Sequence, residues 1–215
     1  SVSVSGTGSG SFANANVGAG KSVTVTGYTL SGTDSGNYSI TQPAGLTANI
    51  TARALTVTAG TDLKVYDSTT TSDGTPTVTS GILQGSDSIS AITQSYATKT
   101  VGTGKTIIPS GVVTDGNSGN NYTLTLSNNL TGEITVASLA VSGMSATSKT
   151  YDAATSAALT GTPAVAPLGS DSVSVSGTGS GSFANANVGT GKAVTVTGYT
   201  LSGTDASNYS ITQPA

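Results

Sequence analysis

The sequence predicts an all-β protein, and two observations support that prediction. Apolar side chains alternate with polar ones at a period of two residues, whereas no apolar stripe follows the 3.6-residue period of a helix. The segments between the alternating runs are rich in glycine, asparagine, aspartate and serine, the residues of turns. Only 35% of residues are hydrophobic, but the alternation and the low net charge of −3 argue for folded strands over disorder.

The expected strands are defined by pairs of apolar residues two positions apart. In chain order these pairs are Val23 and Val25, Leu55 and Val57, Leu63 and Val65, Leu124 and Leu126, Ile134 and Val136, and Val194 and Val196. Valine, and the threonine that often lies between, are stiff at χ1 and suit a pleated, half-buried surface. Turn sequences occupy residues 72–76, 84–87 and 115–120. We expect about seven strands per repeat, in a β-sandwich of immunoglobulin-like type.

Self-comparison indicates that the chain is an array of repeats. Residues 1–44 recur at 172–215 with four changes, which indicates recent duplication. A shorter period is also present, because Lys-Val-Tyr-Asp at 64–67 returns as Lys-Thr-Tyr-Asp at 149–152. The repeating unit is therefore about 84 residues long.

Two further motifs recur with the same period and help to place the repeat boundaries. Val-Gly-x-Gly-Lys occurs at 17–21, 101–105 and 188–192, and Asn-Tyr occurs at 37–38, 121–122 and 208–209. The boundaries predict that residues 1–52 are the C-terminal part of a repeat, 53–136 a complete repeat, and 137–215 a repeat lacking its last strand. No proline-rich or charged linker separates these parts, which favours a stiff rod.

A β-solenoid is the alternative fold. Residues 1–6 resemble residues 22–27, and short coils rich in glycine and asparagine are typical of solenoids. However, this short spacing does not persist through residues 53–136, where only the longer period is found.

The composition excludes several classes of function. The chain has no cysteine and no histidine, so zinc, haem and iron–sulfur sites lose their usual ligands. Cysteine nucleophiles and Ser-His-Asp triads are excluded for the same reason. The net charge of −3 argues against nucleic acid as a partner, and no apolar run is long enough for a membrane span. We therefore expect no enzymatic activity, no catalytic residue, no cofactor and no metal site.

Several motifs allow a functional and a structural interpretation. The Val-Gly-x-Gly-Lys motif lacks the glycine spacing of a phosphate loop, and Lys21 leads into an expected strand, so we interpret it as a β-turn. The aspartates of the Gly-Thr-Asp and Gly-Ser-Asp turns are expected to cap their loops, with calcium binding as the alternative. These aspartates are Asp34, Asp87, Asp171 and Asp205.

The Lys-x-Tyr-Asp motif is expected at the end of a strand, with Tyr66 at least partly buried and in a structural role. The chain also contains Asn-x-Ser/Thr sequons, for which chance and glycosylation are the two explanations. They lie at Asn37, Asn49, Asn121, Asn129 and Asn208.

Four motifs in order resemble the YDG-type repeat domains of large, filamentous-haemagglutinin-like surface adhesins of Gram-negative bacteria. They are the two Lys-x-Tyr-Asp motifs, Gly-Ser-Asp-Ser-Val-Ser-Val-Ser-Gly at 169–177, Phe-Ala-Asn-Ala-Asn-Val-Gly at 183–189, and Leu-Ser-Gly-Thr-Asp through Asn-Tyr at 201–209. One departure is that Ser68 or Ala153 follows the Tyr-Asp pair where the family has glycine, which leaves open whether this turn uses a positive φ.

The resemblance implies an extracellular location on the bacterial cell surface and a structural part in adhesion or biofilm, and it supplies no catalytic residues. We expect a stalk or filament segment that acts as a spacer or assembly module. Its expected partners are neighbouring repeats of the same chain and like molecules in a filament. The alternative is a module that binds host or matrix glycan, which requires aromatic rings outside the core. The candidates for these rings are Tyr28, Tyr96 and Tyr199.

Overall fold

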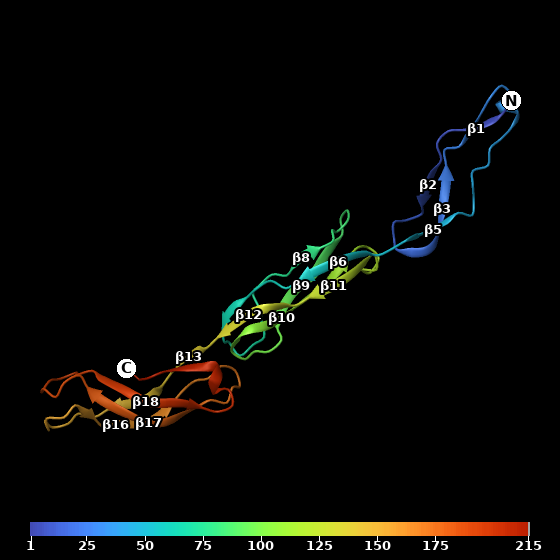
Figure 1. Ribbon diagram of the computed structural model, residues 1–215. Coiled ribbons are helices and arrows are strands. Elements are labelled where there is room, and N and C mark those ends of the chain that lie inside the picture. The colour runs from blue at the N-terminus through green and yellow to red at the C-terminus, as the bar shows by residue number, and fades with distance from the viewer. Residues whose placement is uncertain (215) are drawn as a thin grey trace. The chain divides into compact units, whose positions relative to one another are not determined.

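The protein is built from β-strands joined by turns (Figure 1), in a computed structural model that describes residues 1–214. The helical segments of these residues are single turns of 3-10 helix, η1 (Ser35–Asn37) and η2 (Ala206–Asn208). The predicted all-β fold is therefore confirmed.

The chain forms two compact units, and each draws on segments that are distant in sequence. The first unit comprises Ser1–Thr58, Thr77–Thr93 and Ser110–Ser127. The second unit comprises Ala59–Pro76, Gln94–Pro109 and the chain from Asn128 onward. Strands β9 (Ser88–Tyr96) and β10 (Gly102–Thr114) contribute residues to both units.

In the first unit, β1 pairs with β4, β3 lies between β2 and β5, and β6 lies between β11 and β8. The bounds are β1 (Ser3–Ser5), β2 (Ser9–Phe12), β3 (Gly18–Thr26), β4 (Thr29–Ser31), β5 (Thr47–Ile50), β6 (Arg53–Thr58), β8 (Thr77–Ser80) and β11 (Tyr122–Ser127). Strands β6 and β11 run parallel with Leu55 opposite Leu124. Leu55, Val113 and Tyr122 are buried together. The predicted alternation of β6 is confirmed, because Leu55 and Val57 are buried and the threonines between and after them are not.

In the second unit, one sheet has the order β7-β12-β10-β9, β15-β17-β18 form another, and β13 pairs with β19 and β14 with β16. The bounds are β7 (Leu63–Val65), β12 (Asn129–Thr135), β13 (Ala137–Ala140), β14 (Ser142–Ala146), β15 (Ser156–Ala157), β16 (Leu159–Ala164), β17 (Ser174–Phe183), β18 (Val194–Ser202) and β19 (Tyr209–Thr212). β13 and β19 are parallel, as β6 and β11 are in the first unit. This correspondence reflects the sequence repeat.

Two hydrophobic clusters fill the second unit. One comprises Tyr66, Tyr96, Ile107, Ile134 and Tyr209, together with Ala59, Ala137 and Leu139. The other is centred on Val141, Val196 and Tyr199. Tyr66 and Tyr209 come from different predicted repeats but lie in one cluster, so the boundary between 53–136 and 137–215 is a packed contact.

The strand pairing is not that of a solenoid. Strands such as β2 and β3, β14 and β16, and β17 and β18 pair antiparallel. A solenoid instead stacks successive coils at one fixed offset in sequence. The pairing therefore favours the predicted sandwich-type repeat over the solenoid.

Four residues of the predicted apolar pairs are exposed, namely Leu63, Val65, Leu126 and Val136. Leu63 and Val65 form strand β7 as expected, but their side chains are exposed. The inward positions belong to Lys64, whose Nζ lies 5.5 Å from the centre of the Tyr96 ring, and to Tyr66. The face is reversed because the buried tyrosine and the lysine stem together fill the space that the two aliphatic side chains were expected to fill.

Candidate functional site

Two of the three tyrosines proposed from the sequence as exposed binding residues are buried. Tyr96 and Tyr199 are buried in the hydrophobic clusters of the second unit. Tyr28 is half-buried, and its ring covers Gly8, just as the ring of Tyr199 covers Gly179. The expectation that these rings lie outside the core is therefore corrected for Tyr96 and Tyr199. A ring lying over a glycine on a neighbouring strand is a packing role.

The structure instead brings five polar residues together inside the second unit, and we call them the junction cluster. Tyr66, Ser68 and Lys99 come from the repeat at 53–136, whereas Asp171 and Tyr209 come from the repeat at 137–215. One Asp171 carboxylate oxygen accepts hydrogen bonds from the hydroxyls of Tyr66 at 2.5 Å and Tyr209 at 2.7 Å. The other accepts from the Lys99 ammonium at 2.6 Å and the Ser68 hydroxyl at 3.1 Å. One carboxylate thus joins two repeats.

Local turns hold Asp171 in this position. The Asp171 amide donates to the carbonyl of Leu168 at 3.1 Å, closing the turn that the Gly-Ser-Asp sequence predicts. The Leu168 amide in turn donates to the Tyr209 hydroxyl at 3.0 Å. The rings of Tyr66 and Tyr209 meet edge to face with centroids 5.3 Å apart. The backbone turn and the aromatic packing therefore position the carboxylate together with its contact to Lys99.

Asp171 is a buried charge whose hydrogen bonds stabilise it. Its side chain is 1% exposed, whereas that of Lys99 is 35% exposed. Burial alone would raise the pKa of Asp171, but the hydrogen bonds from Lys99 and the three hydroxyls hold the pKa well below its ordinary value. Burial and then the hydrogen bond to this carboxylate raise the pKa of Tyr209 to about 12. The cluster consequently has an ionised acid and neutral tyrosines at neutral pH.

The Val-Gly-x-Gly-Lys and Asn-Tyr motifs form a second contact of this kind, which sequence inspection did not pair. In the second unit, the Val101 amide donates to the Asn208 side-chain oxygen at 3.0 Å. In the first unit, the Val17 amide donates to the Asn121 side-chain oxygen at 2.8 Å. Each contact links the valine of one repeat to the asparagine of the next. The two motifs are thus the two halves of a repeat-to-repeat connector.

The first unit contains only part of the junction cluster's arrangement. Asp87 occupies the position of Asp171, and it accepts the hydroxyl hydrogen bond of Tyr122 at 2.7 Å. The Gln84 amide donates to the Tyr122 hydroxyl at 2.8 Å, matching Leu168 and Tyr209. In the sequence, Ala15 stands at the position of Lys99. The hydrogen bond from a tyrosine hydroxyl to an aspartate is therefore common to both units, whereas the bond from the Lys99 ammonium to Asp171 belongs to the second.

The Lys-x-Tyr-Asp motif forms a tight turn, as the structural interpretation requires. Lys64 pairs with Asp67 at 2.8 Å, and Lys149 pairs with Asp152 at 2.8 Å. The next residues, Ser68 and Ala153, have φ of 65° and 61°. The turn therefore keeps the left-handed backbone that favours glycine although neither residue is glycine.

This backbone predicts a stabilising substitution. Ala153→Gly should raise the free energy of unfolding by about 0.5–1 kcal/mol, because removing the Cβ relieves the left-handed strain but adds freedom to the unfolded chain. Ser68→Gly is the matched comparison and should not stabilise, since it also removes the Ser68 hydroxyl that bonds Asp171. Urea denaturation of both variants checks this, and equal effects of the two would contradict it.

The chemistry of the remaining motifs is structural within the described residues. Lys21 lies in strand β3, and its ammonium donates to the Asn14 side-chain oxygen at 2.7 Å. A phosphate loop that opens a helix is therefore absent from this segment. Residues 1–214 contain no group of three acidic side chains placed to hold a metal ion. Asp205 accepts the Ser172 amide at 2.9 Å, a loop contact. Over the same residues, no helix has the length and apolar character for crossing a membrane.

Together these contacts define a class of protein: tandem all-β repeats that join through the same motifs in successive copies. The family model for the YDG domain matches residues 1–45, 51–130 and 135–215. The chain belongs to the YDG domain family. No curated protein and no solved structure gave a match to the chain. The boundaries at 1–52, 53–136 and 137–215 stay a prediction beside these matched ranges.

Proposed function

We propose that this chain is a structural segment of an extracellular adhesin on the surface of a Gram-negative bacterium, where its repeats act as a spacer in a stalk or filament. The observation that carries the proposal is the junction cluster, in which a buried carboxylate of one repeat is held by three side chains of the preceding repeat. A contact built from several charge-assisted hydrogen bonds resists bending more than a flexible linker does.

The use of the motifs supports the same proposal. The side-chain oxygens of Asn121 and Asn208 accept hydrogen bonds from a neighbouring repeat, and Asn208 is buried. The Lys-x-Tyr-Asp motif supplies Tyr66 to the junction cluster. The segments that recur in the sequence are thus those that join one repeat to the next, as expected of an array whose stability depends on nearest neighbours.

The glycan-binding alternative receives less support. It depended on exposed rings at Tyr28, Tyr96 and Tyr199, and two of these rings belong to hydrophobic clusters. We therefore propose the spacer and do not assign a ligand to these tyrosines.

Small-angle X-ray scattering tests the spacer. A compact globule of this length has a radius of gyration of about 17 Å by size scaling, and a spacer should have a value well above it. The double variant Asp171→Ala/Asn208→Ala should broaden the distribution of interatomic distances, because it removes both contacts of one junction. Asn128→Ala, which changes an exposed asparagine outside both contacts, is the control and should leave the profile unchanged. A radius near that of a globule for the unmodified chain would overturn the proposal.

A further inference from the structure

We propose that the repeat at 137–215 carries a docking surface for a further YDG repeat of the kind found at 53–136. We call this surface the open socket, and it consists of Tyr151, Phe183, Asn187, Val188 and Lys192. The proposal rests on the spacer function and names the partner that the spacer would bind.

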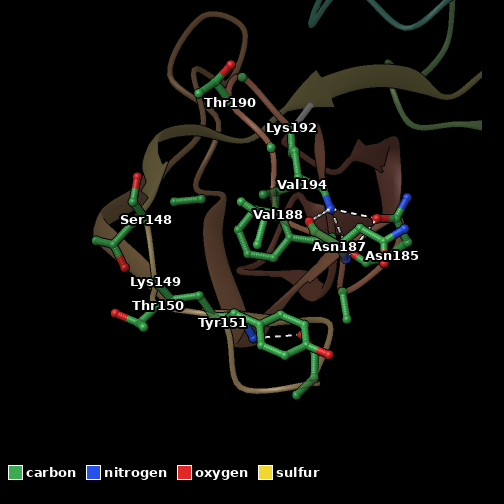
Figure 2. Close-up of a pocket in the computed structure, with 17 residues that line it drawn as sticks. Ser148, Lys149, Thr150, Tyr151, Asn185, Asn187, Val188, Thr190, Lys192 and Val194 are labelled. Carbon is green, nitrogen blue, oxygen red and sulfur yellow. Dashed lines mark hydrogen bonds between the residues drawn. The ribbon is translucent and has the colours of Figure 1, made fainter.

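The open socket is a hollow of about 660 Å³ whose walls come mainly from two segments, residues 146–154 and 183–194. Figure 2 shows side chains of both segments around it, with the Lys192 ammonium bonded to Asn185 and Asn187 on one wall. Val188 is 88% exposed. The lining offers a backbone donor at Val188 and a phenol at Tyr151, beside the apolar ring of Phe183.

In the repeat at 53–136, the residues that correspond to the open socket contact the repeat at 137–215. Tyr151 stands at the position of Tyr66, and Val188 stands at the position of Val101. Tyr66 is 2% exposed and donates to Asp171, whereas Tyr151 is 63% exposed. The lower exposure of Tyr66 coincides with its contacts to Asp171 and Tyr209 of the next repeat. The same surface in its open form therefore fits the same class of partner.

The first unit identifies which kind of repeat fits. Residues 172–215 repeat residues 1–44 almost unchanged, so Val188 and Asn187 correspond to Val17 and Asn16. Val17 donates to the Asn121 side chain at 2.8 Å, and the Asn121 amide nitrogen donates to the Asn16 side-chain oxygen at 3.3 Å. Asn121 belongs to the repeat at 53–136. The structure thus assigns an Asn121-type end as the occupant of the open socket.

The residues at the positions of Lys99 and Ser68 distinguish the open socket from the corresponding surface of the repeat at 53–136, which holds Asp171. Ala186 stands at the position of Lys99, and Ala153 stands at the position of Ser68. A docking aspartate would therefore find the Tyr151 hydroxyl but neither the ammonium nor the second hydroxyl. Ala15 occupies the same position in the first unit, where the Val17–Asn121 contact forms without a lysine. The open socket is consequently suited to an asparagine-centred contact, and successive junctions would alternate between two kinds.

The test is a chain in which residues 45–136 are joined again after Ala215. This addition continues the array in register, because residues 172–215 repeat residues 1–44. Hydrogen exchange is measured at Val188 by mass spectrometry, and the Val17 segment serves as an internal standard that differs from it in sequence. We expect exchange at Val188 to be at least about 10-fold slower than in the 215-residue chain, approaching that of Val17.

Two variants of the added copy make the result specific. Asn121→Ala in that copy should restore fast exchange at Val188, whereas the adjacent Asn120→Ala should not. Unchanged exchange at Val17 in both variants verifies that the array remains folded. Equal Val188 exchange in the extended and original chains would overturn the docking surface. Scattering of the extended chain distinguishes the two proposals, since a protected Val188 in a compact particle would contradict only the spacer.

Discussion

Asp171→Ala should lower the free energy of unfolding of the second unit by about 3 kcal/mol. The substitution removes the acceptor of four hydrogen bonds, from Lys99, Ser68, Tyr66 and Tyr209. It also leaves two buried tyrosine hydroxyls without this partner, and breaking a buried charged network costs more than losing a surface pair. Hydrogen exchange under increasing denaturant measures the loss, because it follows each unit by its own amides.

Asp87→Ala is the matched control in the first unit. Asp87 lies in the same Gly-Ser-Asp turn and accepts the Tyr122 hydroxyl bond. We expect a loss of about 1 kcal/mol, the usual contribution of one hydrogen bond. Similar losses for Asp87→Ala and Asp171→Ala would show that the three side chains from the preceding repeat contribute nothing to stability.

The effect of Asp171→Ala should also depend on pH. The pKa of Asp171 is lowered in the folded protein from its ordinary 3.8, so its stabilising contribution is fully present above that value. As pH falls from 5 toward 2, protonation of the unfolded chain becomes favourable and the contribution declines. The difference in unfolding free energy between the original chain and Asp171→Ala should therefore narrow across this range. A constant difference would contradict a lowered pKa.

Gly198→Ala should destabilise the last repeat by about 3 kcal/mol or more. Gly198 lies within β18 at a φ of 96°, and a Cβ there would lie 2.4 Å from the backbone oxygen of Thr178. The backbone is positive in φ and also sterically blocked, so left-handed strain and overpacking add. Gly177 lies in β17 beside an irregularity in its pairing with β18. A Cβ on Gly177 would likewise lie too close to the backbone oxygen of Gly198.

Gly191→Ala separates the two costs. Gly191 has a φ of 61°, but no atom lies within 4 Å of where its Cβ would be. This variant should lose only about 1 kcal/mol, the cost of the backbone conformation alone. Thermal denaturation followed by circular dichroism compares the two variants. Equal losses would mean that the close backbone approach at Gly198 relaxes freely.

The predicted strands were largely correct because alternation follows directly from burial of one face. Leu55 and Val57 are buried as the pattern requires, and their strand pairs with β11 at Leu124. The pattern failed at Leu126 and Val136, which are exposed, and at both apolar positions of β7, Leu63 and Val65. There, an amphipathic lysine and a tyrosine with a hydrogen-bonded hydroxyl occupy the inward positions, and hydropathy alone does not distinguish such residues from surface ones.

The junction cluster was not predictable from the sequence. Asp171 was identified as a turn residue and Tyr66 as partly buried, but nothing in the sequence connects two residues that lie 105 positions apart. The repeat did mark the motifs of the second contact between repeats, since Val-Gly-x-Gly-Lys and Asn-Tyr recur together. What it could not supply was that the valine of one copy meets the asparagine of the next copy.

By itself, the sequence determined the all-β class, the period of about 84 residues and the absence of cysteine and histidine chemistry, because composition and periodicity are local properties of the chain. Tertiary structure alone decided which polar groups meet. The hydrogen bonds of Asp171 depend on turns and strands that place atoms from two repeats within 3.1 Å, and folding is what makes that carboxylate a buried charge. The same folding places glycines such as Gly198 inside strands, where neighbouring backbone excludes any side chain.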